Sequence, residues 1–223
     1  NNTTMAGGET TPGAAAPAPG TEGVPVVPGT PGTASADSMA IANRGAATGA
    51  NADLSGLATM SPADQMAILG ASNAAEILTS EAAQPKLQNP GVKAYARRMI
   101  AEHRAMQKQA DQLATRLDIT PGSPEHATNK ARMANQMAQQ LKAAPASAPS
   151  NGAQYADRQF IDGQVLAHQQ TLNELQAMQG TQNAEIATLV KQAIPKVQAH
   201  LDEAKRLQQQ LATGNAGANN GMN

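Results

Sequence analysis

The chain has 223 residues and no cysteine, its formal net charge at neutral pH is −1, and aromatic residues make up 1 % of it. The lack of cysteine excludes disulfide bonds, thiolate zinc sites and iron–sulfur clusters. The near-zero charge and the scarcity of aromatic rings argue against nucleic acid as a partner. No run of about 18 apolar residues occurs, so the sequence predicts no transmembrane helix.

The first part of the chain is rich in proline, glycine, alanine and threonine, as in GGETTPGAAAPAPGTEG. Such a composition cannot bury enough apolar surface to offset its ordering entropy, so residues 1–60 are predicted to form a flexible or polyproline-like tether. A tether of this kind can hold an exported domain away from a surface, and a featureless disordered tail is the alternative. The chain begins with Asn1 rather than methionine, which predicts that a signal peptide has been removed.

Helical signals begin near Met60. Ser61 is a good N-cap, Pro62 suits the first helical position and Pro85 is a stop signal, so a helix is predicted from residue 62 to about 84. Later breaks stand at NPG, ITPGSPEH, APASAPSNG and GTQN, and the final stretch GNAGANNGMN is predicted to be disordered from residue 213 to 223. Further helices are predicted at residues 90–117, 124–143, 152–179 and 182–212.

These elements predict an all-α fold. Four of the helices are long enough to pack as antiparallel neighbours, and the glutamine-rich helix at 124–143 is a shorter segment in the connection between two of them. An alanine-rich apolar core suits helices that approach closely rather than a sheet. The sequence therefore predicts an antiparallel four-helix bundle with an extra helical segment over residues 61–212.

Each long helix places one ionisable side chain in an apolar row. The rows follow the seven-residue spacing that is typical of bundle interiors. Neutral imidazole suits zinc, copper, iron or nickel, and one carboxylate would complete a set of four ligands. The sequence therefore predicts a metal site in the bundle core, with zinc, copper or iron as the candidate metals. Its candidate ligands are Glu76, His103, His168 and His200.

Three further acidic residues stand close to these histidines along the chain. Glu102, Asp162 and Asp202 are predicted to orient the imidazole rings by accepting hydrogen bonds from them. The alternative to a metal site is a buried polar cluster, in which the histidines bond to Asn73, Glu76 and backbone carbonyl groups and fix the register of the helices.

Helix geometry argues against a simple ring of ligands. If the last two helices turn near residue 181, His200 lies level with Asp162, and His168 lies about 9 Å further along the bundle. Glu76 is similarly offset from His103 by roughly 6 Å. Side chains can close part of these gaps.

Four motifs resemble the bacterial family called domain of unknown function 4142, whose members are often labelled outer membrane proteins. The first helix carries Glu76, and VKAYARRMIAEH matches the family pattern V-K-x-[FY]-A-x-x-M-[IV]-x-[DE]-H that ends at His103. FIDGQVLAHQQTL, which contains His168, resembles the third motif. IPKVQAHLDEAKRL, with Pro195 and His200, resembles the last. The resemblance covers residues 62–211 or so, which is the whole helical part.

The resemblance implies a ferritin-like helical bundle that is exported to the bacterial periplasm or cell envelope, outer-membrane-associated or secreted. It implies no established activity. Di-iron carboxylate bundles need Glu-x-x-His on two helices, whereas Ile100, Val165 and Val197 stand three residues before the three histidines. Ferroxidase or oxygenase chemistry is therefore not expected.

Two functions follow as expectations. The first is a non-catalytic envelope protein that acts as an interaction or structural module, with envelope proteins or further copies of the chain as partners. The second is a protein that binds or stores a metal at the Glu76 and three-histidine site. An enzymatic function is the least supported hypothesis, because the sequence offers no Ser-His-Asp set and no phosphate-binding glycine loop.

Overall fold

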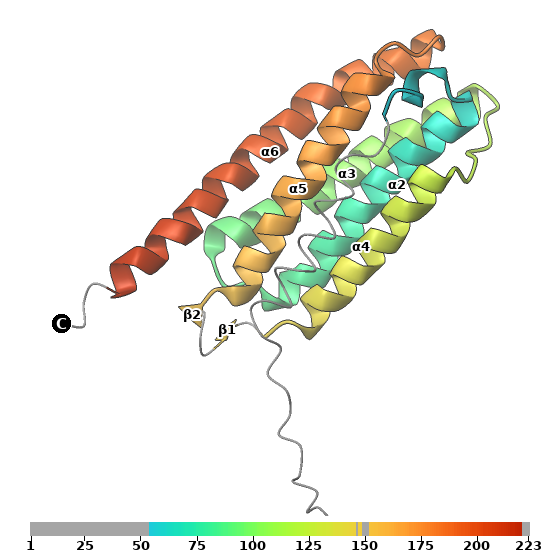
Figure 1. Ribbon diagram of the computed structural model, residues 1–223. Coiled ribbons are helices and arrows are strands. Elements are labelled where there is room, and N and C mark those ends of the chain that lie inside the picture. Colours follow the sequence, from blue (N-terminus) through green and yellow to red (C-terminus); the bar gives the residue numbers. More distant parts are fainter. Residues whose placement is uncertain (1–53, 146, 149–151, 220–223) are drawn as a thin grey trace, which may run out of the picture. The chain divides into compact units, whose positions relative to one another are not determined.

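The computed structural model describes residues 54–145, 147–148 and 152–219 of the chain. Most of the predicted tether, residues 1–53, and the last four residues lie outside this range. Within it, the chain is helical except for short connections, and the predicted all-α bundle with an extra helix is confirmed (Figure 1). The elements are η2 (Leu57–Thr59), α2 (Pro62–Ala83), η3 (Gln84–Lys86), α3 (Pro90–Arg116), α4 (Glu125–Ala143), β1 (Ser147–Ala148), β2 (Gly152–Ala153), α5 (Tyr155–Met178) and α6 (Ala184–Asn219).

Side-chain caps set where three of the helices begin. The Ser61 hydroxyl accepts a hydrogen bond from the Asp64 backbone N–H at the start of α2. Asn89 caps α3 and Asn183 caps α6 in the same way, each accepting from two backbone N–H groups. These short polar residues satisfy the N–H groups that a helix leaves unpaired at its first turn.

Two details of the chain differ from the sequence expectation. β1 and β2 form a two-residue antiparallel pair between α4 and α5, and β2 occupies the first two residues of the helix predicted at 152–179. A pair this short leaves no hydrophobic alternation in the sequence. The backbone of α6 continues to Asn219, past the expected end at residue 212. Gly214 and Gly217 weaken a helix there, but no proline follows to break it.

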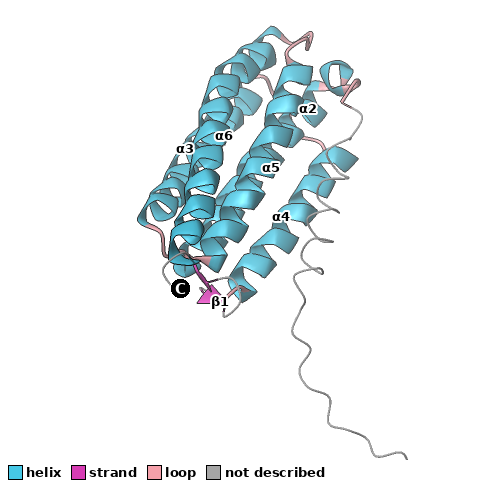
Figure 2. Ribbon diagram, turned by 60° about the vertical axis from the view of Figure 1, so that its left-hand side comes forward, coloured by secondary structure: helices cyan, strands magenta, loops and turns pink. Residues whose placement is uncertain are grey.

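The packing order places α2 between α3 and α4, while α5 and α6 run along each other (Figures 1 and 2). α3 also meets α6, and α2 meets α5, so α2, α3, α5 and α6 enclose the core. α4, the predicted extra segment, lies along α2 and contacts α5. It contributes mainly small residues, with Leu141 as its large buried side chain.

The core consists of two apolar clusters stacked along the bundle. On α3, Val92 and Met99 belong to one cluster and Leu113 belongs to the other. On α5, Phe160 belongs to the first cluster and Leu172 to the second. Between the clusters lies a layer of buried polar side chains, which includes three histidines.

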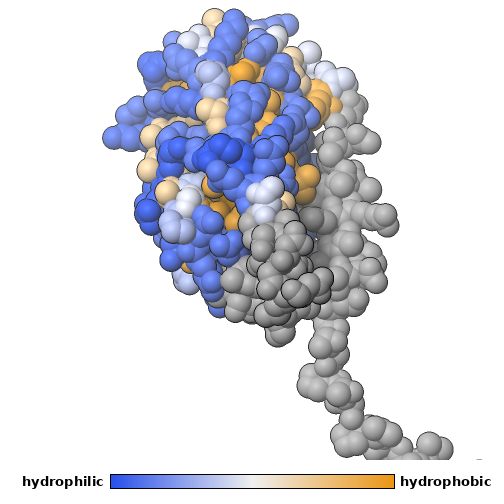
Figure 3. All heavy atoms as spheres, turned by 90° about the vertical axis from the view of Figure 1, so that its left-hand side faces the viewer, coloured by the Kyte–Doolittle hydropathy of each residue, from blue (hydrophilic) through white to orange (hydrophobic). Residues whose placement is uncertain are grey.

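The outer surface is polar. The face in Figure 3 is predominantly hydrophilic, with separate small apolar areas. Among the residues that the structure describes, Leu166 is the large hydrophobic residue that stands exposed, at 39 %. No helix in the described part of the chain is long and apolar enough to cross a membrane.

Asp157 joins the first turn of α5 to the connection before α3. Its buried carboxylate accepts hydrogen bonds from the backbone N–H groups of Gln88 and Asn89, at 3.1–3.2 Å. Asp157→Ala would leave these donors unpaired, and we expect the free energy of unfolding to fall by about 1–3 kcal/mol. Urea denaturation measures this loss. Asp202→Ala is the matched control, because Asp202 is exposed and bonds one turn away on its own helix; equal losses in both variants would contradict the assignment.

Candidate metal centre

Three histidines from three helices meet inside the bundle. His103 lies on α3, His168 on α5 and His200 on α6, and their exposed fractions are 1 %, 1 % and 2 %. The centroids of their rings are 5.3–5.6 Å apart. One ring nitrogen of each lies within 4.8 Å of a ring nitrogen of both others. We call these three residues the histidine trio.

The outer nitrogen of each ring contacts an oxygen that acts as a hydrogen-bond acceptor. A neutral imidazole carries one N–H, and the proton is found on the ring nitrogen that has a hydrogen-bond acceptor beside it. In a neutral ring the proton is therefore placed on the nitrogen that contacts the acceptor. The three contacts are His103 Nδ1 to Asn73 Oδ1 at 3.0 Å, His168 Nδ1 to the Gln164 carbonyl oxygen at 3.0 Å, and His200 Nε2 to Glu102 Oε2 at 2.6 Å.

The remaining nitrogens point into the bundle without a partner. Among the described residues, no hydrogen-bond partner reaches His103 Nε2, His168 Nε2 or His200 Nδ1, and all three atoms are buried. Each carries a lone pair, because the proton is on the other nitrogen. A water molecule has two hydrogens and can satisfy two of the three lone pairs. A metal cation accepts all three at once.

Burial favours the neutral form of His103 and His200. Desolvation lowers the pKa of His103 well below the ordinary histidine value, and the neighbouring His168 and His200 lower it further. Desolvation also lowers the pKa of His200, although the hydrogen bond to Glu102 acts in the opposite direction. Neutral imidazole is the form that binds metals.

Glu76 lies beside the trio on α2 rather than within it. Its carboxylate is 3 % exposed and accepts a hydrogen bond of 2.8 Å from Gln164 Nε2. Its other oxygen is 3.6 Å from His168 Nδ1, the outer nitrogen of that ring. Glu76 is not part of the group whose ligand atoms all lie within 4.8 Å. In this arrangement Glu76, a predicted ligand, contacts His168 and does not join the three histidines as a fourth ligand.

The three predicted orienting carboxylates have different surroundings. Glu102 contacts His200, as described above. Asp162 accepts a hydrogen bond from Gln208, and Asp202 accepts one from Gln198, so neither of these aspartates bonds to a histidine of the trio.

The predicted offset of about 9 Å between His168 and His200 is wrong. Their ring centroids lie 5.4 Å apart. Asp162 was expected to lie level with His200. It bonds instead to Gln208, which is eight positions beyond His200, and this shift explains the error. The first two turns of α6 therefore extend past the end of α5, which moves His200 level with His168.

Tyr95, on α3, closes the trio on the side of the first apolar cluster. It is fully buried, its ring centroid is 6.5 Å from that of His168, and its hydroxyl donates to the His200 carbonyl oxygen at 3.4 Å. Burial, reinforced by the Glu76 charge, raises the pKa of Tyr95 well above its ordinary value. The phenol group is therefore uncharged, and its ring shields this side of the trio from water.

A second buried cluster joins α4 to α5. Glu174 is 1 % exposed and contacts His126 Nε2 at 2.8 Å and Lys130 Nζ at 2.7 Å. Burial raises the pKa of Glu174, but the hydrogen bond from His126 and the charge of Lys130 outweigh it, so that this pKa lies below its usual value. The carboxylate is balanced by its own partners, and this cluster is best explained as the contact that holds α4 in place.

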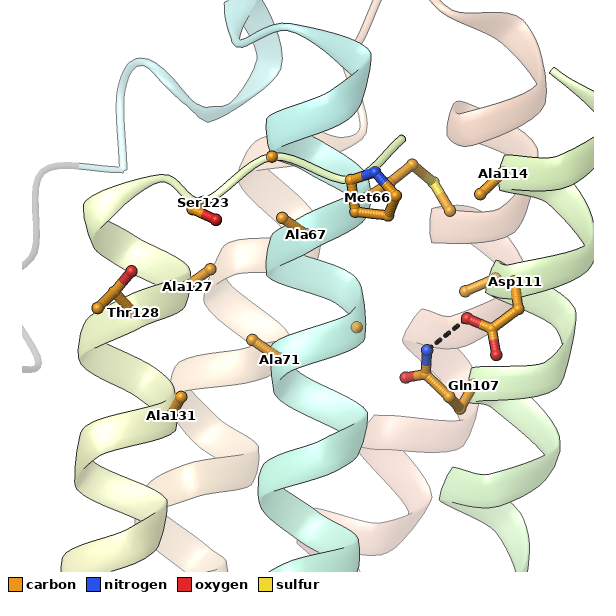
Figure 4. A pocket seen from close by; sticks show the side chains of 14 residues that line it. Met66, Ala67, Ala71, Gln107, Asp111, Ala114, Ser123, Ala127, Thr128 and Ala131 are labelled. Atoms are coloured by element: carbon orange, nitrogen blue, oxygen red, sulfur yellow. Dashed lines mark hydrogen bonds between the residues drawn. The ribbon is translucent and has the colours of Figure 1, made fainter. Parts of the chain in front are cut away.

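A hollow of about 360 Å³ lies where α2, α3 and α4 meet (Figure 4). Its lining consists mainly of alanine and other small side chains. Asp111 is the one ionisable residue in that lining, and it accepts a hydrogen bond from Gln107. The hollow has no cluster of groups that would perform chemistry.

Comparison with known proteins identifies a family. A family model described as Domain of unknown function (DUF4142) matches residues 39–207, which is well over half of the chain. No curated protein matches, and neither does any solved structure.

Proposed function

The chain belongs to the family Domain of unknown function (DUF4142), and from this starting point we propose that it binds one divalent transition-metal ion at His103, His168 and His200. The convergence of three buried, unpartnered ring nitrogens from three helices carries the proposal. Each ring is held by an acceptor on its outer side, which is the arrangement that orients metal-binding histidines in proteins.

The charges around the trio support a divalent cation. Glu76 is buried, and its ion-pair contact among the described residues is with His168 Nδ1 at 3.6 Å. An uncompensated buried carboxylate is costly. One dication bound by the three imidazoles would balance the charge of Glu76.

The donor set also selects the class of metal. Imidazole nitrogen favours zinc, copper, nickel, cobalt and ferrous iron over magnesium and calcium, which prefer oxygen. Three histidines leave a further coordination position for water or another small ligand. We propose zinc or copper as the main candidates, because copper binds most tightly among the divalent first-row metals and zinc favours tetrahedral histidine sites.

We further propose that the protein acts in the bacterial cell envelope as a non-catalytic binding protein. Its resemblance to exported envelope proteins supports the location. The lack of Glu-x-x-His at the three histidines supports the non-catalytic role. A module that works mainly by docking to other proteins is the weaker candidate, because the described surface exposes little apolar area beyond Leu166 (Figure 3).

Metal is expected to stabilise the fold. Untagged protein is stripped with a chelator and then melted with Zn²⁺ at about 100 times its Kd, which by mass action adds about 2.7 kcal/mol. For a domain of this size, the melting temperature should rise by roughly 5–10 °C. Mg²⁺ is the control and should cause no shift. An unchanged melting temperature with Zn²⁺, Cu²⁺, Ni²⁺ and Co²⁺ alike would overturn the proposed function.

A further inference from the structure

A hollow of about 340 Å³ opens at the surface between α3 and α6, and His200 forms part of its wall. Because His200 also belongs to the histidine trio, one imidazole ring separates this hollow from the metal site. The hollow in Figure 4 has none of the trio in its lining. The other residues around the hollow at His200 are Arg98, Glu102, Pro195, Lys196, Ala199 and Glu203.

We propose that the metal ion enters and leaves the trio through this hollow, with the His200 ring as the gate and Glu102 as the group that holds the gate closed. The inference rests on the proposed metal binding and names the route by which that site exchanges its ion.

The His200 ring is the member of the trio whose outer partner is free to move. Glu102 has a side chain that is 41 % exposed, and it bonds His200 Nε2 at 2.6 Å. The partners of the other two rings are held inside the bundle, because Asn73 is 8 % exposed and Gln164 is 2 % exposed. When Glu102 rotates outward into solvent, His200 loses its one anchoring hydrogen bond and its ring can turn.

The backbone beside the gate is also weakened. Pro195 lies within α6, five residues before His200, and lines the hollow. Proline has no N–H, so the carbonyl group of Lys191 lacks its usual helical partner. This segment of α6 can therefore adjust at a lower cost than an uninterrupted helix.

The size of the hollow suits a hydrated cation, and its charged lining is balanced, with two cations, Arg98 and Lys196, and two carboxylates, Glu102 and Glu203. Six waters of about 30 Å³ each occupy roughly 180 Å³, which is less than the 340 Å³ of the hollow. Glu102 and Glu203 supply two carboxylates there, and Arg98 contacts both of them. An arriving dication competes with Arg98 for these carboxylates, and its attraction to Glu102 draws that side chain away from His200.

Blocking the hollow tests the route. Ala199 is exposed and lines the hollow, so Ala199→Trp should fill it without replacing a residue of the trio. Stripped protein is mixed rapidly with Co²⁺ alone, whose visible absorption reports its ligands, and dissociation is followed by adding excess chelator. We expect both association and dissociation to slow by at least about tenfold, with Kd unchanged, as for a gated site.

Ala212→Trp is the matched control, because Ala212 is exposed on the same helix and is not part of the hollow. Its rates should equal those of the wild type. Normal Co²⁺ affinity with wild-type rates in Ala199→Trp would overturn the entry route and leave the metal site intact. Failure of the wild type to bind Co²⁺ or Zn²⁺ at all would overturn the proposed function, and this inference with it.

A smaller substitution at the same position provides a second variant in case the first does not fold. If Ala199→Trp does not give the helical circular dichroism of the wild type, Ala199→Leu makes the same test with less bulk. It should slow both rates by the same factor as each other, which leaves Kd unchanged, and wild-type rates in this variant would contradict the gate.

Discussion

Replacing His103 with alanine is expected to abolish the metal-dependent rise in melting temperature and to weaken Zn²⁺ binding by more than about 100-fold. Loss of an outer partner alone costs 10–100-fold in typical metal sites, and this substitution removes a ligand. Two imidazoles would remain, which is too few for a closed zinc site. The measurement is a competition titration with a chromophoric chelator, beside elemental analysis of the purified protein.

The fourth histidine provides the matched control. His126 bonds to Glu174 between α4 and α5 and takes no part in the trio. His126→Ala should therefore keep the wild-type Zn²⁺ affinity, although it removes a partner of a buried carboxylate and lowers stability. Wild-type affinity in His103→Ala would contradict the trio as the binding site.

A second substitution at the same position separates a metal site from a buried polar cluster. His103→Leu fills the space with an apolar side chain. If the trio serves mainly to fix helix register, the metal-free variant should be clearly less stable than metal-free wild type. If the trio is a metal site, we expect the metal-free variant to be at least as stable, because replacing buried polar groups with apolar ones is often neutral or stabilising.

Much of the fold could be predicted from short signals in the sequence. Ser61, Pro62 and Pro85 gave the limits of α2 to within a residue or so, because capping and backbone restriction act within one helical turn. The all-α class followed from composition and spacing. The β1–β2 pair could not be predicted, because two residues per strand carry no period.

The inward orientation of the trio could be predicted, and its three-dimensional grouping could not. A seven-residue row fixes the face on which His103, His168 and His200 lie. It says nothing about how far one helix slides along another. The overhang of α6 past α5 depends on how the connection around residue 181 packs, and an error of two turns there separated His168 from His200 in the sequence prediction.

The outer partners were the least predictable part of the site. Glu102 precedes His103 in the chain, yet it contacts His200 on another helix. The partner of His168 is the carbonyl group of Gln164 on its own helix, which is available to any residue four positions later. No residue type marks such a contact. Asn73 was predicted as a histidine partner under the alternative of a buried polar cluster, and it bonds to His103.

Metal-free protein is expected to lose stability steadily as the pH falls from about 6.5 towards 5. Burial lowers the pKa of both His103 and His200 in the folded state, whereas the unfolded chain protonates them near the ordinary histidine pKa of 6.5. Below that pH the unfolded state binds more protons than the folded state, so acidification favours unfolding. Each histidine that is charged only on unfolding contributes about 1.4 kcal/mol per pH unit, and two such groups approach about 2.7 kcal/mol per pH unit.

Other titrating groups act in a different range. Glu174 has a lowered pKa in the fold, so its contribution to stability is lost mainly below the ordinary glutamate pKa of 4.5. Around the trio, the charged side chains are Glu76, Glu102 and Arg98, and the two carboxylates oppose rather than cause the loss of stability when the rings become charged. Burial raises the pKa of Asp157, which acts in the opposite direction, so measurement between pH 7.5 and 5 reports mainly the histidines.

Urea denaturation of chelator-treated protein across this range gives the slope directly. His103→Leu removes one of the two groups, and its slope should be smaller by about 1.4 kcal/mol per pH unit. His126→Ala should keep the wild-type slope, because it leaves the trio unchanged. A flat wild-type profile would mean that the trio is already protonated or accessible to water in the folded state. Protonated or hydrated rings would not present three free lone pairs to one ion, so the same titration also tests the geometry on which metal binding depends.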